Sequence, residues 1–165
     1  MPTGPAARIL DPVMHPLPPV LQPGPGSLNV IIGFKPAWRG VLAAAAAALQ
    51  AAKQISDTAI QTAEAATAAA VGPAEPVAYA AEQATKAACL ASMGSAITAA
   101  AMGADIHMCT TPVPVPPHGP GVVIDGSKTV LINMLAACRQ GDTVLEAIGP
   151  PNKIAMGCPT VIIGG

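Results

Sequence analysis

The residues of this chain that could bind a metal ion are its three histidines and one cysteine near them. His107 and Cys109 are two residues apart, a spacing that places both side chains on the same side of an extended strand. His15 lies between prolines in one loop, and His118 follows a second proline-rich loop. Such loops are stiff and lose little entropy when they are held in place. Imidazole nitrogens and a thiolate are usual ligands of a closed, four-coordinate structural zinc site. The four residues therefore predict one structural zinc ion, which would stabilise a small fold with little core.

Two alternatives for the fourth ligand stay open at this point. Glu146 is a reserve oxygen ligand, and Cys158 is a further thiol. A simpler interpretation is that the histidines are ordinary exposed loop residues, which is common for this residue type. The four cysteines have no tight pairing pattern, so no disulfide is expected.

The histidines, cysteines and carboxylates of this sequence do not predict an enzyme. No histidine lies beside a nucleophilic serine or cysteine motif, so a catalytic triad has nothing to be built from. The Gly-x-Ser-x-Gly motif and the glycine-rich motifs that bind phosphates and dinucleotides are absent from the sequence. Asp57 and Glu64 are seven residues apart and are interpreted as part of the solvated face of a helix. We therefore expect no catalytic residues.

Composition limits the class of protein further. The chain has 165 residues, and its apolar content of 52% is largely alanine, with only 2% aromatic residues. Alanine buries little area, so one domain with a thin core is expected. The formal net charge of −1 and the lack of a Lys/Arg cluster argue against nucleic-acid binding. The first residues lack the basic and apolar parts of a signal peptide, so export would use another route than general secretion.

A short phrase with a strand pattern occurs three times in the chain. It consists of Gly, a small residue, two variable positions, and then β-branched and apolar residues that end in Gly or Asn. Its copies are residues 26–33 (GSLNVIIG), 126–133 (GSKTVLIN) and 157–164 (GCPTVIIG). Internal repetition indicates one structural unit that is stacked or rotated on itself. Three strand-and-turn units predict a body with approximate threefold symmetry, which is what one chain needs to sit on the end of a trimer.

A second phrase accompanies the first. It places Arg8, Arg39 and Arg139 three residues after a Pro or Ala. Asp11 and Asp142 follow the first and the third of these arginines at short range. We therefore expect local Arg–Asp pairs that fix the turn of each unit.

Residues 41–104 have a different character, because alanine and other helix-forming residues dominate them. Gly72-Pro73 and Pro76 interrupt the run, which predicts two helices, at 41–71 and 75–103, joined as an antiparallel hairpin. The larger apolar residues should form the contact between the helices: Leu42, Leu49, Ile55, Ile60, Leu90, Met93 and Ile97.

Insertion of this segment into a membrane is the alternative to a hairpin in water. Residues 87–104 carry no charge and approach the length of a span. Alanine drives insertion only weakly, and the first helix carries Lys53, Asp57 and Glu64. The uncharged halves, 41–52 and 87–104, both lie at the root of the hairpin, where burial against each other and the rest of the protein is the better explanation.

The two flanking segments, 1–40 and 105–165, are rich in Pro and Gly and are expected to be mainly β. Residues 141–151 (GDTVLEAIGPP) are interpreted as a loop that contains Glu146, and residues 12–26 (PVMHPLPPVLQPGPG) as an ordered proline-rich loop. The strands are predicted at 29–32, 121–125, 129–133, 153–156 and 159–163, between Gly, Pro and Asn turn signals.

These segments resemble PAAR-repeat proteins, the sharpened tips of type VI secretion and related contractile-injection spikes. The resemblance rests on four segments: PAARILD (5–11), GSLNVIIGFKPAWRG (26–40), GVVIDGSKTVLINMLAACRQGD (121–142) and GCPTVIIGG (157–165). It implies a small conical three-repeat β-prism made by 1–40 and 105–165, with 41–104 as an inserted antiparallel helical hairpin. In the family one zinc ion, bound by His and Cys, holds the pointed end, and the corresponding loops here contain His15, His107, Cys109 and His118. The chain departs from the family where the third loop often has a Cys, since Leu145 and Glu146 stand there.

The resemblance also implies a function and its partners. The chain would be a non-enzymatic tip that caps a trimeric VgrG-like spike, one chain per trimer, and sharpens it for piercing a target membrane. Before firing it would be in the bacterial cytoplasm, and the type VI apparatus would then secrete it. Residues 41–104 would bind an effector, an adaptor or a chaperone, or pack along the side of the spike. The partner-binding candidates are the repeated strand residues Val30, Ile32, Val130, Ile132, Val161 and Ile163.

Two other functions compete with this expectation. The first is a zinc-stabilised structural scaffold module of a larger assembly, with no role in piercing. The second is a membrane-acting toxin that inserts its helical hairpin into lipid.

Overall fold

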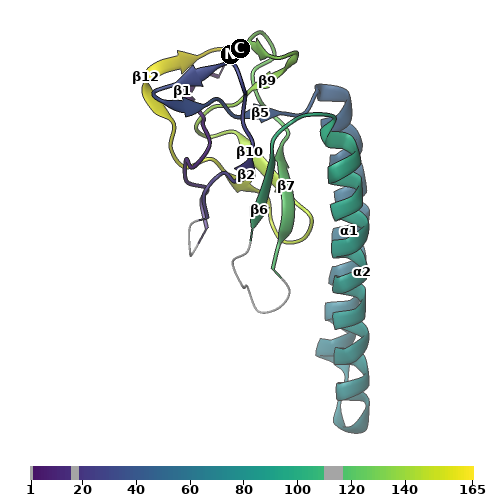
Figure 1. The fold of residues 1–165 in the computed structure, drawn as a ribbon. Helices are drawn as coiled ribbons and strands as arrows, with labels where there is room; N and C mark the ends of the chain where they lie inside the picture. The colour runs from purple at the N-terminus through teal and green to yellow at the C-terminus, as the bar shows by residue number, and fades with distance from the viewer. Residues whose placement is uncertain (1, 16–18, 110–116) are drawn as a thin grey trace.

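The computed structural model describes residues 2–15, 19–109 and 117–165, which form a body of short β-strands and two long helices at its side (Figure 1). The strands are β1 (Gly4–Ala6), β2 (Pro23–Gly24), β3 (Ile31–Ile32), β4 (Lys35–Pro36), β5 (Arg39–Gly40), β6 (Ile106–Cys109), β7 (Gly119–Val123), β8 (Leu131–Ile132), β9 (Leu135–Ala137), β10 (Thr143–Glu146), β11 (Asn152–Lys153) and β12 (Cys158–Ile163). They pair in four sheets, of which the largest has the order β11-β10-β7-β6-β2. The others are β5-β9-β8, β3-β4 and β1-β12.

Each of the five predicted strands overlaps an observed one: β3, β7, β8, β11 and β12. The expectation of a loop at 141–151 is wrong in part, because residues 143–146 form β10 between β7 and β11. The β-branched residues Thr143 and Val144 open this strand, and its last three side chains are buried. The proline-rich segments 16–18 and 110–116, which were expected to be stiff loops, lie outside the described residues.

The centre of the β body contains a cyclic set of three backbone hydrogen bonds. The amide of Ala7 donates to the carbonyl of Cys138 at 2.9 Å, that of Cys138 to Trp38 at 3.2 Å, and that of Trp38 to Ala7 at 2.9 Å. All three residues are buried in one apolar cluster. Each of them directly precedes one of the repeated arginines, so the three arginine-containing segments meet at this ring.

Three short strand pairs surround this ring in equivalent registers. Pro5 of β1 pairs with Ile162 of β12, Pro36 with Ile31, and Ala136 with Leu131. The first pair joins the beginning and the end of the chain, and both termini lie at this end of the body (Figure 1). A buried alanine stands two residues before each of the repeated arginines. These alanines and three buried isoleucines form one apolar cluster: Ala6, Ala37, Ala137, Ile32, Ile132 and Ile163.

Arg8 and Arg139 form the predicted local ion pairs. Arg8 Nη2 lies 2.9 Å from Asp11 Oδ1, and Arg139 Nη2 lies 3.1 Å from Asp142 Oδ1. In both turns the arginine amide donates to the carboxylate, and the aspartate amide donates back to the arginine carbonyl at 3.1 Å. Two residues separate the charged partners, so each turn is tight.

Arg39 forms the same kind of turn with Asp105, which comes after the two long helices in the sequence. Its Nη2 lies 2.8 Å from Asp105 Oδ1, its amide donates to Asp105 Oδ2 at 2.8 Å, and the Asp105 amide donates back at 3.0 Å. Asp105 is completely buried and also accepts a hydrogen bond from the amide of Gly26. Residues 41–104 therefore stand at a position that a single residue occupies in the other two turns.

The helices have the predicted arrangement. Helix α1 spans Ala43–Ala69 and α2 spans Glu75–Ala101, with the short helix η1 (Gly72–Ala74) between them. At 1.5 Å per residue each long helix measures about 40 Å. Gly72 adopts a left-handed conformation (φ 62°), which favours glycine, and Pro73 starts the turn.

The root of the hairpin packs on the β body, as the lack of charge in this part of the sequence indicated. Leu49 of α1 and Met93 and Ile97 of α2 share an apolar cluster with Val122 and Leu145 of the body. At the level of Leu90 the helix passes close to the start of β7, where a Cβ on Gly119 would lie 2.5 Å from Leu90 Cδ1.

The expected contact stripe between the helices is wrong at two positions. Leu42 and Ile55 are exposed, whereas Lys53 and Ser56 of α1 are buried. The outer half of the hairpin contains polar contacts in addition to alanine. Lys86 bridges Glu82 on its own helix and Glu64 on α1, with N–O distances of 2.6 and 2.8 Å.

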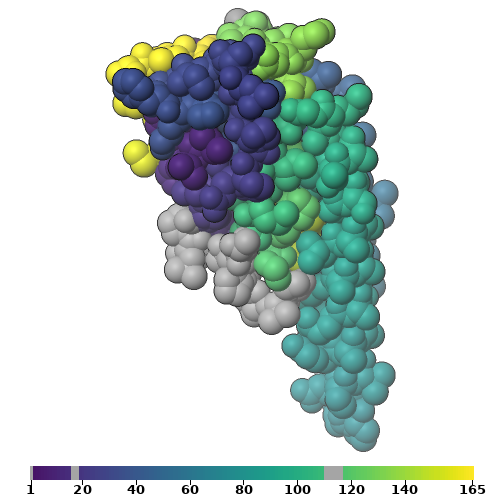
Figure 2. All heavy atoms as spheres, viewed as in Figure 1, coloured from purple at the N-terminus to yellow at the C-terminus, as the bar shows by residue number. Residues whose placement is uncertain are grey.

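The hairpin runs along one side of the body, and its turn extends beyond the end opposite the termini (Figure 1, Figure 2). Among the described residues, neither helix combines the length and the apolarity that a membrane span requires.

The repeated turns predict that the hairpin can be removed. A chain in which one glycine replaces residues 41–104 should close the Arg39–Asp105 turn as its two counterparts close. We expect it to keep a β-rich circular dichroism spectrum and a cooperative thermal transition, at a lower temperature because Val122 and Leu145 lose their cover. A chain without a cooperative transition would contradict this equivalence of the turns.

Candidate metal centre

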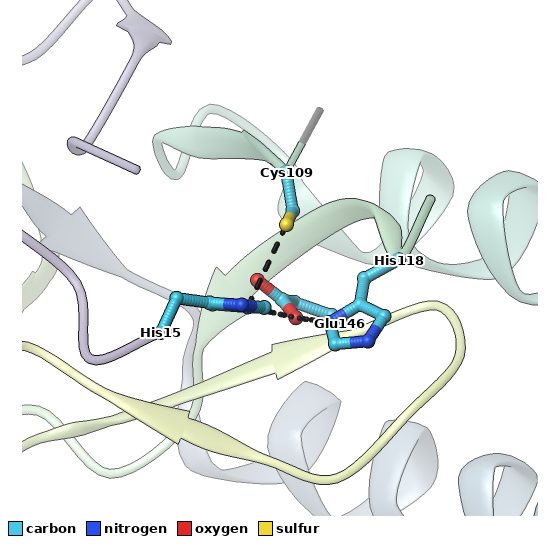
Figure 3. Close-up of side chains that lie close together, drawn as sticks. All are labelled: His15, Cys109, His118 and Glu146. Carbon is cyan, nitrogen blue, oxygen red and sulfur yellow. Dashed lines mark hydrogen bonds and ion pairs between the residues drawn. The ribbon is translucent and has the colours of Figure 1, made fainter. Parts of the chain in front are cut away.

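Four side chains that can bind a metal ion converge at the end of the body opposite the termini. They are His15, Cys109, His118 and Glu146, and one donor atom of each lies within 4.8 Å of the others (Figure 3). Cys109 is the last residue of β6, and His118 directly precedes β7, so the pairing of these two strands holds both side chains. Glu146 ends β10, the other neighbour of β7.

The distances within the cluster suit donors around one small cation. His118 Nδ1 lies 2.7 Å from Glu146 Oε2, His15 Nε2 lies 3.3 Å from the same oxygen, and Cys109 Sγ lies 3.5 Å from His15 Nε2. The amide group of Asn152 donates to Glu146 Oε2 at 2.8 Å and lies 2.9 Å from His15 Nε2. Two imidazoles, a thiol and a carboxylate are a donor set that Zn²⁺ accepts.

Burial of these groups supports a metal ion more than the alternative of ordinary surface histidines. The side chains of His15 and Glu146 are 1% and 0% exposed, and that of His118 is 9% exposed. Within the described part of the chain, His15 Nδ1, both ring nitrogens of His107 and Glu146 Oε1 are buried and form no hydrogen bond of good geometry, although His107 Nε2 and Glu146 Oε1 lie 3.4 Å apart. Buried polar atoms normally have partners, so unpaired ones beside four donors fit a group that binds a cation.

His107 approaches the cluster from a different side than the sequence suggested. Its Nε2 lies 3.4 Å from Glu146 Oε1, whereas His15 and His118 contact Oε2. His107 and Glu146 both pair with Gly121 of β7, one from each neighbouring strand. The two side chains can meet over this residue because a Cβ on Gly121 would lie 2.9 Å from Glu146 Cγ. The structure thus groups Glu146, rather than His107, with the other three donors.

The histidines also affect the ionisation of Glu146. Burial raises the pKa of its carboxyl group, but the contacts with His107 and His118 and their charge lower it by more. The pKa of Glu146 therefore lies below its ordinary value. A carboxylate that is ionised at neutral pH is the form that binds a cation.

Cys158, the other candidate for the fourth ligand, is far from this arrangement in the fold. It pairs with Ala6 in the β1-β12 sheet, and its Sγ lies 3.3 Å from the Thr160 hydroxyl. Cys138 belongs to the central ring, and Cys89 is buried against α1 near the Ser56 carbonyl. No cysteine forms a disulfide, and all four lie in the described part of the chain.

The second set of candidate residues, on the repeated strands, is only partly available to a partner. Ile32, Ile132 and Ile163 are buried in the apolar cluster beneath the strand pairs, so little of their side chains is accessible from outside, and partner contact through them stays a prediction. The half-exposed residues of this set are Val30, Val130 and Val161. The residues between them, Ile31, Leu131 and Ile162, are 57%, 56% and 61% exposed.

A protein-family model described as the PAAR motif matches residues 113–165. The chain contains a PAAR motif. The resemblance to PAAR-repeat proteins that the sequence indicated is confirmed for this part of the chain. No curated protein and no solved structure matches the chain.

The PAAR motif contains β7 to β12, and with them two of the four clustered side chains, His118 and Glu146. His15 and Cys109 precede the matched residues and reach the cluster through the fold. PAAR motifs are associated with the tip proteins of type VI spikes, a family that is structural in character.

Sequence reasoning assigned Glu146 a reserve role and did not identify Asp105 at all. A signal for Asp105 was present, since Asp105 stands two residues before His107, much as Asp11 stands four before His15. Both aspartates begin the segment that leads from an arginine turn to the candidate metal centre.

Proposed function

We propose that the chain is a non-enzymatic tip protein that caps the blunt end of a trimeric VgrG-like spike of a type VI secretion system, one chain per trimer. The observation that carries this proposal is the equal exposure of Ile31, Leu131 and Ile162. Three apolar side chains in equivalent registers suit a partner that presents one surface three times. The PAAR motif in residues 113–165 supports the same partner.

In this proposal residues 1–40 and 105–165 form a conical three-repeat prism, and 41–104 are an insertion into its second unit. The cyclic hydrogen bonds among Ala7, Trp38 and Cys138 support three units around one axis. The end with the termini and the three strand pairs is the base. Capping a trimeric β-helix with these strands would cover edges that otherwise invite aggregation.

The opposite end is the point, and zinc is the ion proposed for it. His15, Cys109, His118 and Glu146 would hold the zinc ion. A bound zinc ion supplies folding free energy by cross-linking segments that share little apolar core. A point made rigid in this way would concentrate force on a small area of a target membrane when the sheath contracts. The proposed location is the bacterial cytoplasm before firing, followed by export through the type VI apparatus.

The helical hairpin is proposed to carry cargo. Its turn projects beyond the point, away from the base, so packing along the side of the spike is disfavoured by its direction (Figure 1). Its outer half exposes Ile55, Val71, Val77 and Tyr79. An effector, an adaptor or a chaperone that binds there would travel at the front of the spike.

A charge at the base tests the capping proposal. Leu131→Asp should weaken binding to the purified trimeric spike protein of the same bacterium by at least about tenfold, because a carboxylate would be desolvated in an apolar contact. Ile55→Asp is the matched control, since Ile55 is exposed (75%, against 56% for Leu131) but lies on α1. Affinities from biolayer interferometry would decide. Equal affinities of wild-type and Leu131→Asp chains would argue for a scaffold module without this partner.

The cargo proposal has its own test. The chain with one glycine in place of residues 41–104 should bind the spike as the wild type does but fail to export at least one effector. Comparison of the secreted proteins of the two strains measures this. Unchanged secretion of every cargo would refute a cargo role for the hairpin.

A further inference from the structure

Two turns at the base have backbone conformations that disfavour the residues found in them. The β3-β4 turn has Gly33 at φ 52° and Phe34 at φ 67°, and the β8-β9 turn has Asn133 at φ 54° and Met134 at φ 65°. Two-residue hairpin turns of this kind need a positive φ at both positions. Glycine and asparagine adopt it readily, but phenylalanine and methionine do so only with steric strain.

In the described part of the chain, burial does not compensate for this strain. Phe34 is 101% exposed and Met134 is 82% exposed, so neither side chain gains free energy from burial. A glycine at either position would relieve the strain and remove an exposed apolar group. The same unfavourable choice in two equivalent turns indicates that the side chains serve a contact outside the chain.

The position of these turns identifies the surface to which they belong. Phe34 lies three residues after Ile31, and Met134 lies three residues after Leu131, so both are continuous with the exposed residues of the proposed base. Gly165 holds the third equivalent position, with φ 101°. The base thus has two large projecting side chains rather than three.

A hollow adjoins one of them. It has a volume of about 290 Å³ and lies where the hairpin leaves the body, lined in part by Leu42, Met102, Met134 and Leu135. Met134 therefore forms both a projection and one wall of a recess. An apolar partner surface could therefore enclose the Met134 side chain and also fill the adjoining hollow.

We propose that Phe34 and Met134 are the anchor residues of the base, which insert into apolar recesses at the blunt end of the trimeric spike. The inference rests on the proposed function, because it names the residues through which that partner would be held. Aromatic and methionine side chains are enriched in protein interfaces, and a few such residues usually provide most of the binding free energy. A threefold partner presents three equal recesses, of which the chain would fill two with these anchors.

The test compares two effects that should differ: each substitution should preserve or raise stability but weaken binding. In the full-length chain, Phe34→Gly and Met134→Gly should leave the melting temperature unchanged or raise it by a few degrees, because the strain is released. Each substitution should weaken binding to the purified trimeric spike protein at least tenfold. Differential scanning fluorimetry and biolayer interferometry measure the two effects.

Leu10→Gly is the matched control, because Leu10 is also exposed and has φ 65°, but it belongs to the turn between Arg8 and Asp11. It should raise the melting temperature similarly and leave the affinity within twofold. Affinities within twofold for Phe34→Gly and Met134→Gly would overturn the inference, as would an equal loss of binding in Leu10→Gly. If the wild-type chain itself does not bind the spike, the proposed function fails and the anchors fail with it.

Discussion

Replacing His118 by Ala is expected to lower the zinc content of the purified chain from about one ion per chain to nearly none. The substitution removes one of four donors and deprives the buried Glu146 carboxylate of its partner at 2.7 Å. Because binding of a structural zinc ion contributes directly to folding, the melting temperature should fall by about 10 °C or more. Elemental analysis by plasma mass spectrometry and a thermal scan measure both effects.

A pair of further variants identifies the ligand set. Glu146→Gln should lose zinc as His118→Ala does, whereas His107→Gln should retain it, because His107 contacts Glu146 and is not one of the four clustered donors. Zinc content is measured on the folded, monomeric fraction of each protein. Retention by Glu146→Gln together with loss in His107→Gln would restore the set of three histidines and a cysteine that the sequence suggested.

Asp105→Ala is expected to lower the free energy of unfolding by about 3–5 kcal/mol, since removing one partner of a buried ion pair leaves the other uncompensated. Asp105 is completely buried, and it accepts hydrogen bonds from the amides of Gly26 and Arg39 as well as from the Arg39 guanidinium. All of these donors would lose their acceptor. Urea denaturation followed by circular dichroism measures the loss.

Glu75→Ala provides the comparison, because Glu75 is an exposed carboxylate in the first turn of α2. Its loss should cost less than about 1 kcal/mol. If Asp105→Ala caused a similarly small loss, the Arg39–Asp105 contact would not be needed to hold together the two chain segments on either side of helices α1 and α2.

Local patterns in the sequence predicted most of the elements of this fold. The alanine-rich helices and their break at Gly72-Pro73 follow from helix propensity, which acts over short range. The Arg8–Asp11 and Arg139–Asp142 pairs follow from spacing within a turn. The repeats indicated the family, because their order along the chain is specific.

The side-chain directions on the repeated strands could not be predicted in this way. In each copy a valine is followed by two large apolar residues, so alternation does not say which of them faces the core. The register with β4, β9 and β1 settles it: Ile32, Ile132 and Ile163 point inward. This register depends on pairing between distant segments, and for β12 on pairing with the first strand of the chain.

The grouping of side chains at the candidate metal centre likewise depends on long-range pairing. Glu146 approaches His107 because both flank Gly121, a relation that exists only after β6, β7 and β10 have paired. Asp105 meets Arg39 only when the two ends of the inserted hairpin come together. The place of Asp105 ahead of His107 marks it as a candidate, but spacing along the chain does not identify Arg39 as its partner or bring Glu146 to His107.

The most direct test of the account is the native mass spectrum of the chain mixed with the purified trimeric spike protein of the same bacterium. The account predicts one dominant complex, with the mass of three spike subunits, one chain and one zinc ion. A complex with three chains per trimer, or no complex at micromolar concentrations at which the spike stays trimeric, would contradict it.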